Sequence, residues 1–128
     1  MNLKNEKIIK VLVIDPDEDF SRDVRLFLED TYYVDTRQTI DQLDYIILLN
    51  KIDLIVMAVD YPDKNLISLL EQIRKNHKKL KIVIMYTYFS SGQDFEKSLV
   101  NYADDIITKP FDVALLKNKL DSLATATI

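Results

Sequence analysis

Short apolar runs alternate along this chain with longer stretches in which apolar and polar residues mix. Lys10–Ile14, Leu54–Val59 and Lys81–Thr87 are nearly continuous apolar runs, typical of strands that are buried on both faces of a parallel sheet. Tyr32–Thr36 and the pair Ile106–Ile107 are weaker candidates of the same kind. The pattern therefore predicts a sheet that is built from these five segments.

The stretches between these runs have the spacing of amphipathic helices. Asp17 can cap a helix whose apolar face consists of Phe20, Val24, Phe27 and Leu28. Leu43, Ile46, Ile47 and Leu49 to Leu54 form one apolar stretch, in which only Asn50-Lys51 separates a helix from the strand that follows. Three further helical faces follow in chain order: Leu66, Leu69, Leu70 and Ile73; Phe95, Leu99, Val100 and Ala103; Val113, Leu116 and Leu120. This alternation predicts an α/β fold, a doubly wound sandwich with a central five-stranded parallel sheet. Helices should cover both faces of the sheet, because parallel neighbours need crossover connections.

The length and composition limit the kind of protein. A chain of 128 residues fits one domain, and we expect residues 1–128 to form a single unit with a core of about residues 8–124. Apolar residues make up 48% and charged residues 30%, as in folded soluble proteins. There is no cysteine, which suits a reducing compartment. The N-terminus lacks the pattern of an export signal, and the apolar runs fall short of the roughly 20 residues that cross a bilayer. We expect a cytoplasmic protein without membrane contact.

Charge and residue content argue against several functions. The net charge of −4 argues against binding nucleic acid, which depends on Lys and Arg. The one basic cluster, Lys75 to Lys81, is predicted to be the solvated end of a helix, with His77 as a surface residue. A chain with one glycine cannot form a glycine-rich phosphate loop, and one histidine has no partner for a catalytic triad. We therefore expect no enzymatic activity.

Candidate chemistry lies where the predicted strands end. In doubly wound sheets, ligands bind outside the carboxyl ends of the strands. Asp15-Pro16-Asp17 follows the first predicted strand and Ala58-Val59-Asp60 the third. Thr87 ends the fourth, and Lys109-Pro110 follows the fifth. We expect these residues to share one edge of the sheet.

These segments resemble the response-regulator receiver domain of two-component signalling, as in chemotaxis regulators. VLVIDPDEDF, DLIVMAVDYP, IVIMYT and ADDIITKPF occur in the order and spacing of that family, and LLEQIR falls at its third helix. The likeness extends from about Lys10 to Leu123. It implies the flavodoxin-like (βα)5 fold and a role in phosphorelay signalling from a histidine kinase.

The resemblance implies roles for three residues. Asp15 matches the first of the two acidic metal ligands, Lys109 the lysine that pairs with the acceptor or its phosphate, and Thr87 the hydroxyl that binds a phosphate oxygen. In the family these groups and Mg2+ stabilise the transition state of phosphoryl transfer to an aspartate.

Three positions depart from the family pattern. The phosphoacceptor position, four residues before Pro62, is Ala58, and a methyl group cannot accept phosphate. Pro16 replaces the second acidic residue, so Asp15 is the only matched carboxylate and Mg2+ should bind weakly at best. Ile106 stands where the family usually has a Tyr or Phe that reports phosphorylation.

Two hypotheses for the function follow. In the first, the chain is a degenerate receiver, a phosphorylation-independent module that binds protein partners through its fourth and fifth helices and the strand between them. In the second, it is a working receiver in which Asp60 stands in as acceptor, or in which alanine has replaced a natural aspartate at position 58. Asp17 could supply a metal ligand in that case, although helix capping is its simpler role. With Ala58 at the acceptor position, we expect Lys109 to turn towards Asp15 or Asp60. Because no output domain follows before Ile128, any output should come through binding, to a histidine kinase or another signalling protein.

Overall fold

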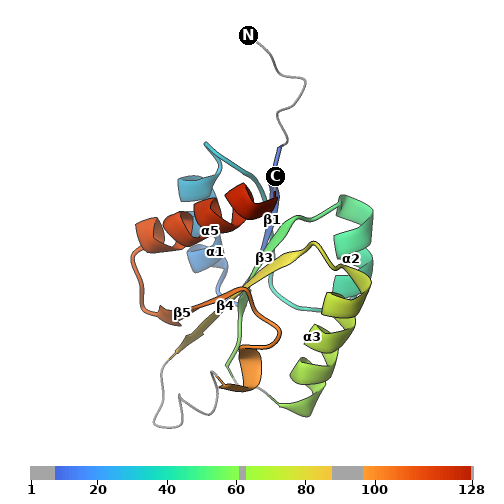
Figure 1. Ribbon diagram of the computed structural model, residues 1–128. Coiled ribbons are helices and arrows are strands. Elements are labelled where there is room, and N and C mark those ends of the chain that lie inside the picture. The colour runs from blue at the N-terminus through green and yellow to red at the C-terminus, as the bar shows by residue number, and fades with distance from the viewer. Residues whose placement is uncertain (1–7, 61–62, 88–96, 128) are drawn as a thin grey trace.

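The computed structural model describes residues 8–60, 63–87 and 97–127 as a three-layer α/β sandwich (Figure 1). Its sheet contains β1 (Lys10–Ile14), β2 (Tyr33–Arg37), β3 (Leu54–Ala58), β4 (Lys81–Thr87) and β5 (Asp105–Lys109). Its helices are α1 (Glu18–Leu28), α2 (Leu43–Asn50), α3 (Lys64–Asn76) and α5 (Val113–Thr127), and residues 97–99 are also helical. The strands are all parallel in the order β2-β1-β3-β4-β5, so the predicted doubly wound, flavodoxin-like sheet is confirmed.

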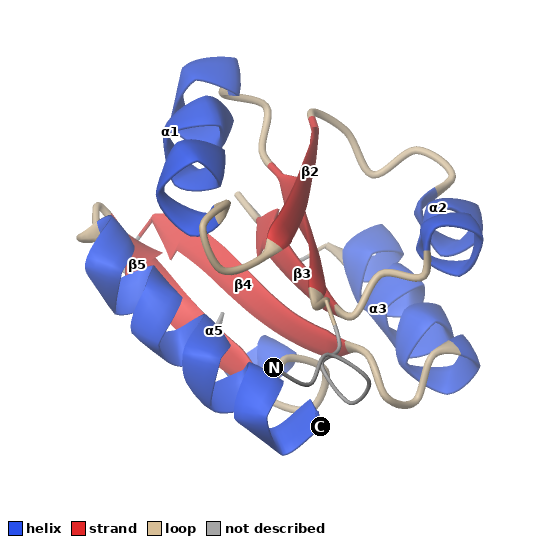
Figure 2. Cartoon of the chain, turned by 90° about the horizontal axis from the view of Figure 1, so that it is seen from above, coloured by secondary structure: helices blue, strands red, loops and turns tan. Residues whose placement is uncertain are grey.

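The two faces of the sheet support separate halves of the core. Alternate residues of a strand point to opposite faces. Leu12, Ile55 and Ile84 therefore pack with the buried faces of α2 and α3, whereas Val13 and Val56 pack with α1 and α5. Figure 2 shows α1 and α5 on one side of the sheet and α2 and α3 on the other. The central strands are buried on both faces, which explains their nearly continuous apolar sequences.

Side-chain caps fix the starts of two helices next to the carboxyl edge of the sheet. The Asp17 carboxylate accepts a hydrogen bond from the Phe20 N–H at 3.1 Å, and Asp63 accepts one from the Leu66 N–H at 2.8 Å. These bonds satisfy N–H groups that have no partner within the helix. The predicted capping role of Asp17 is confirmed.

Several sequence expectations need correction. β2 runs one residue later than the predicted Tyr32–Thr36, β3 ends at Ala58 and β5 is longer than the predicted pair of isoleucines. Phe27 is 45% exposed, so it does not belong to the buried face of α1, which uses Ser21 instead. His77 is half-buried and its Nε2 lies 2.7 Å from an Asp44 carboxylate oxygen, so it ties α3 to α2.

Other expectations fall on parts of the chain that the structure does not describe. Pro62 and Phe95 lie outside the described residues, and of Thr87 only the backbone is described. The predicted fourth helix is therefore seen only at residues 97–99, where Leu99 is buried in the core.

Candidate functional site

The strand register brings the predicted site positions to one edge of the sheet. Ile14 pairs with Met57, so Asp15 and Ala58 are the next residues along two neighbouring parallel strands. Ala58 pairs with Met85 in β4, and Thr87 pairs with Lys109 in β5. All four positions therefore lie at the carboxyl ends of adjacent strands, where this type of sheet binds ligands.

Asp15 and Lys109 form an ion pair at this edge. Lys109 Nζ donates to Asp15 Oδ2 at 2.5 Å, with 3% of the Asp15 side chain exposed and 24% of the Lys109 side chain. The other carboxylate oxygen of Asp15 accepts a hydrogen bond from the Asp17 N–H at 2.9 Å. A buried carboxylate needs such partners to offset its lost hydration. The expected turn of Lys109 towards an acidic neighbour is confirmed, with Asp15 as the partner.

One aromatic ring covers the lysine, and a second ring packs against the first. Lys109 Nζ lies 4.3 Å from the centre of the Phe20 ring, a distance at which a cation is attracted to the ring face. Phe20 in turn meets Phe111 edge to face, with ring centres 5.8 Å apart. The helical pattern of the sequence predicts that Phe20 lies on an apolar helix face, but it indicates no role for Phe111. Its position two residues after Lys109 was the signal that could have indicated it.

Ala58 and Asp60 lie at the end of β3 beside a different part of the edge. Ala58 is partly buried against the core, and Asp60 is exposed two residues later. Both line a groove of 350 Å³ with Ile40, Asp63 and Leu66. The groove contains the carboxylates of Asp60 and Asp63 but no cation among its described lining residues.

The described residues do not form a site suited to Mg2+. Among residues 8–60, 63–87 and 97–127, no group of three or more His, Asp or Glu side chains could hold a metal ion. Asp15 uses both oxygens for Lys109 and Asp17, and Asp17 caps α1. Pro16 offers neither a carboxylate nor an N–H group. The donor set therefore does not match the oxygen cage that Mg2+ requires.

Ile106, the position where the family usually has an aromatic residue that reports phosphorylation, lies on β5. Ile106 is partly buried, pairs with Ile84 and packs against the core cluster on the α2 and α3 side of the sheet. Just before it, Asp104 accepts from Arg74 at 2.9 Å and from the Ile82 N–H at 2.7 Å. These bonds anchor the start of β5 to α3 and β4.

Comparison with known proteins agrees with this arrangement. Residues 11–121 match the sequence pattern of the response regulator receiver domain. The chain is 32% identical over 113 residues to the transcriptional regulatory protein KdpE of Staphylococcus aureus, covering 87% of this chain and 48% of that protein. It thus spans about half the length of the curated relatives it matches.

Solved structures show the same fold. A two-component response regulator from Clostridium difficile superposes with a TM-score of 0.75 at 28% identity, covering 91% of this chain and 96% of that one. A response regulator from Thermotoga maritima gives a TM-score of 0.78 at 24% identity, covering 93% and 99%.

The parallel sheet, its helical layers and the residues at its carboxyl edge define a receiver of the flavodoxin-like class. The chain belongs to the response regulator receiver domain family of two-component signalling. No helix among its described residues is long and apolar enough to span a bilayer. Receiver domains are in general signalling modules rather than enzymes.

Proposed function

We propose that this domain is a degenerate receiver, which works in the cytoplasm as a phosphorylation-independent module for binding other signalling proteins. The observation that carries this proposal is the Lys109–Asp15 ion pair at 2.5 Å beside an alanine at the acceptor position. In the family, the matched lysine serves the acceptor or its phosphate. Here it serves a carboxylate that would otherwise bind metal, so the pocket is internally neutralised.

A partner would bind at the face formed by β5, α5 and the residues just before β5. Val100 is 63% exposed and Leu115 is 46% exposed there. Lys119 on α5 lies 3.1 Å from Asp105 on β5, which fixes these two elements to each other. A face that is held by such contacts suits constitutive binding. Its partners are proteins, whether a histidine kinase or another signalling component, and neither nucleic acid nor membrane.

The alternative is a working receiver. Asp60 is exposed and close in sequence to Ala58, so its carboxylate is accessible to a phosphoryl donor. A protein with a natural aspartate at position 58 would act in the same way. Both forms of the alternative require Mg2+ and a phosphoryl adduct.

Intact-mass measurement after incubation with acetyl phosphate and Mg2+ separates the two functions. We expect no phosphoryl adduct. An adduct that is lost in Asp60→Asn but kept in Asp63→Asn, a neighbouring exposed carboxylate, would establish Asp60 as acceptor and refute the proposal. We also expect Mg2+ to bind no more tightly than millimolar, about 4 kcal/mol. A micromolar dissociation constant by calorimetry would contradict that expectation.

A further inference from the structure

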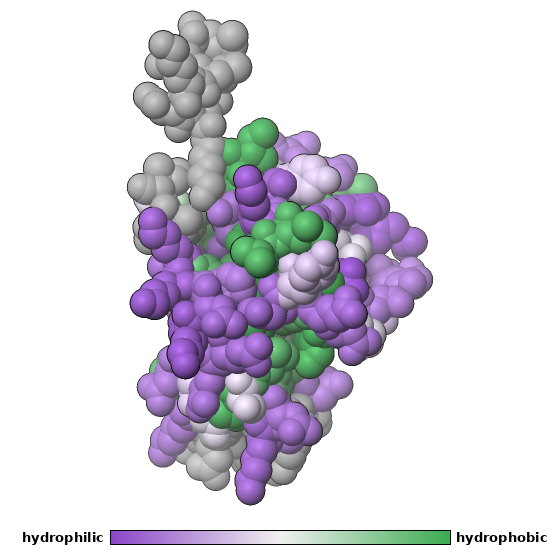
Figure 3. Space-filling view, turned by 90° about the vertical axis from the view of Figure 1, so that its right-hand side faces the viewer, coloured by the Kyte–Doolittle hydropathy of each residue, from purple (hydrophilic) through white to green (hydrophobic). Residues whose placement is uncertain are grey.

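The helix α2 exposes three large apolar side chains on its outer side. Tyr45 is 59% exposed, Leu48 69% and Leu49 61%. Leu48 and Leu49 come three and four residues after Tyr45, a spacing that places all three on one face of the helix as an outer stripe. Figure 3 views this side of the molecule and shows exposed apolar patches among polar residues. A helix that is apolar all round is normally buried on all sides, which indicates that a partner covers the stripe.

The helix cannot bury the outer stripe by turning on its axis. Leu43, Ile46 and Ile47 on its inner side are part of the core. The Asp44 carboxylate lies 2.7 Å from His77 Nε2, which ties α2 to α3. The outer stripe is therefore a fixed surface of the domain.

A groove beside the outer stripe has room for an apolar side chain of a partner. It has a volume of 630 Å³. Tyr45 and Leu48 line it from α2, Leu69 lines it from α3, and Ile40 from the residues before α2. The stripe and the groove together form one apolar docking surface.

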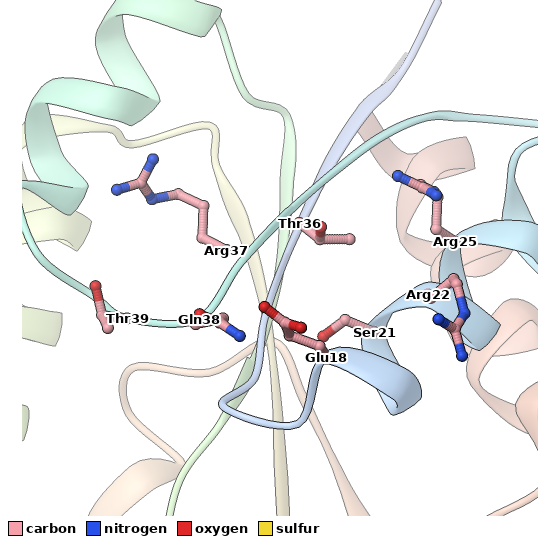
Figure 4. Close-up of a pocket in the computed structure, with 8 residues that line it drawn as sticks. All are labelled: Glu18, Ser21, Arg22, Arg25, Thr36, Arg37, Gln38 and Thr39. Carbon is pink, nitrogen blue, oxygen red and sulfur yellow. The ribbon is translucent and has the colours of Figure 1, made fainter.

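The pocket between α1 and the end of β2 has a different character. All of its lining residues are polar, and Figure 4 shows the Arg25 and Arg37 side chains pointing to different sides of β2. Its charges therefore do not converge on one ligand, and its polar lining suits water. This pocket supplies a control surface for experiments on α2.

The charges at the two ends of α2 favour a second copy of this chain as the occupant. Asp41 lies before the helix and Lys51 directly after it, and both are exposed with no side-chain ion pair to another described residue. The 8 residues of α2 span roughly 12 Å, so the two charges cannot pair within one molecule. An antiparallel second α2 would place Asp41 of each copy near Lys51 of the other, with the outer stripes between them. A surface that is complementary to itself is the requirement for a twofold dimer.

We propose that α2 pairs with α2 of a second copy of this chain in an antiparallel, twofold dimer. Such a dimer is independent of the function proposed above, because α2 and α5 lie on opposite sides of the sheet (Figure 2). It leaves the face formed by β5 and α5 free in each copy. One short helix on each side makes a small interface, so we expect a micromolar dissociation constant.

Analytical ultracentrifugation over a range of concentrations tests for the dimer. We expect a concentration-dependent dimer that Leu48→Glu weakens at least about tenfold, because each copy would then bury a charge in the outer stripe. Leu26→Glu makes the same change at a residue that is 54% exposed on α1, on the other side of the sheet, and should not weaken the dimer. A monomer at concentrations up to about 1 mM would overturn the proposal and assign the stripe to a different partner. Equal weakening by the two variants would also overturn it.

Exchange of the end charges tests the pairing of Asp41 with Lys51. Asp41→Lys and Lys51→Asp should each weaken the dimer, because each places like charges opposite one another, and the two together should restore it. Arg25→Glu changes the charge as much as Lys51→Asp does, but at the pocket beside α1, and should leave the dimer unchanged. Circular dichroism shows whether each variant is folded. A double variant that dimerises no better than the single variants would overturn the proposal.

Cross-linking with a short bismaleimide tests the orientation of the two helices. The chain has no cysteine, so introduced thiols are the only ones present. A mixture of Asp41→Cys and Lys51→Cys proteins should cross-link, since the mixed dimer brings the two thiols together and keeps one Asp41–Lys51 pair. Each variant alone should cross-link less, because antiparallel helices hold its two thiols at opposite ends. As much cross-linking in each variant alone as in the mixture would overturn the proposal.

Discussion

Lys109 is held at the carboxyl edge by one carboxylate and one aromatic ring, so its removal leaves a defined defect. In Lys109→Met, Asp15 stays buried with the Asp17 N–H as its remaining partner. We expect a loss of about 2 to 4 kcal/mol in the free energy of unfolding. Asp15→Asn should cost less, because the partly exposed ammonium can turn to water. The double variant should lose less than the sum of the two, and urea unfolding measures this coupling. Additive losses would show that the ion pair contributes nothing.

Ser21 offers the opposite case, a side chain whose removal should stabilise the protein. Ser21→Ala removes a buried hydroxyl without a partner and places a better helix former within α1. We expect a gain of about 1 kcal/mol in the free energy of unfolding. Ser68→Ala, on an exposed position of α3, should change stability only by a few tenths of a kcal/mol, about the difference in helix propensity. If Ser21→Ala is destabilising, the hydroxyl has a partner in solution.

For individual residues, the sequence predicted where the site residues lie better than which side chains contact them. Asp15, Ala58 and Lys109 could be placed because strand ends are fixed by the apolar runs that precede them. The ring of Phe111 and the buried Ser21 could not, since neither follows from a periodic pattern. For α1 the pattern favoured Phe27 as the buried residue, but the helix instead turns the small serine towards the sheet.

A hydrogen bond between two titratable side chains, Tyr32 and Asp121, holds α5 against the residue that precedes β2. Tyr32 donates to Asp121 at 2.5 Å, and Lys117 lies 2.8 Å from the same carboxylate. Burial, and then the hydrogen bond and charge of Asp121, raise the pKa of Tyr32 well above its ordinary value of 10.0. Burial by itself raises the pKa of Asp121, but the hydrogen bonds from Lys117 and Tyr32 and the charge of Lys117 lower it below its ordinary 3.8.

These shifts predict two pH ranges in which stability falls. The contribution of protonated Tyr32 is complete below pH 10.0, the value of the unfolded chain, and is lost as the pH rises towards the higher folded value. That of ionised Asp121 is complete above pH 3.8 and is lost as the pH falls towards the lower folded value. Tyr32→Phe should therefore flatten the alkaline decline in urea midpoints. Tyr33→Phe, which changes an exposed tyrosine next to it, should not. Equal alkaline declines in the two variants would contradict this assignment.

For the whole molecule, the order of strands and helices was predictable because parallel strands impose helical crossovers between them. The outer face of α2 was not predictable, because the apolar run YIILL within LDYIILLN is compatible with a helix or a strand and does not show which side faces water. The pocket between α1 and the end of β2 likewise joins residues from two elements, and the spacing of these residues in the sequence does not indicate it.

Restoring the acceptor tests how much of the receiver mechanism the molecule retains. Ala58→Asp places a carboxylate one residue beyond the Ile14–Met57 pair, next to Asp15. The new carboxylate should draw Lys109 away from Asp15 and free that residue to bind metal. We expect Mg2+ affinity to increase at least about tenfold in calorimetry. Val59→Asp, which places the charge at a buried neighbouring position, should not increase it.

The response of Ala58→Asp to beryllofluoride then shows whether the coupling between the acceptor site and β5 has also been lost. If NMR shifts reach Thr87 and Ile106, the acceptor alone was lost and the switch remains intact. If the variant binds Mg2+ and beryllofluoride but β5 is unchanged, the isoleucine at position 106 has separated the site from the output face. That second result is the one we expect, because Ile106 is held against the core beside an anchored Asp104 and lacks the aromatic ring that would move. A variant that binds neither Mg2+ nor beryllofluoride would show that position 58 is not the acceptor position.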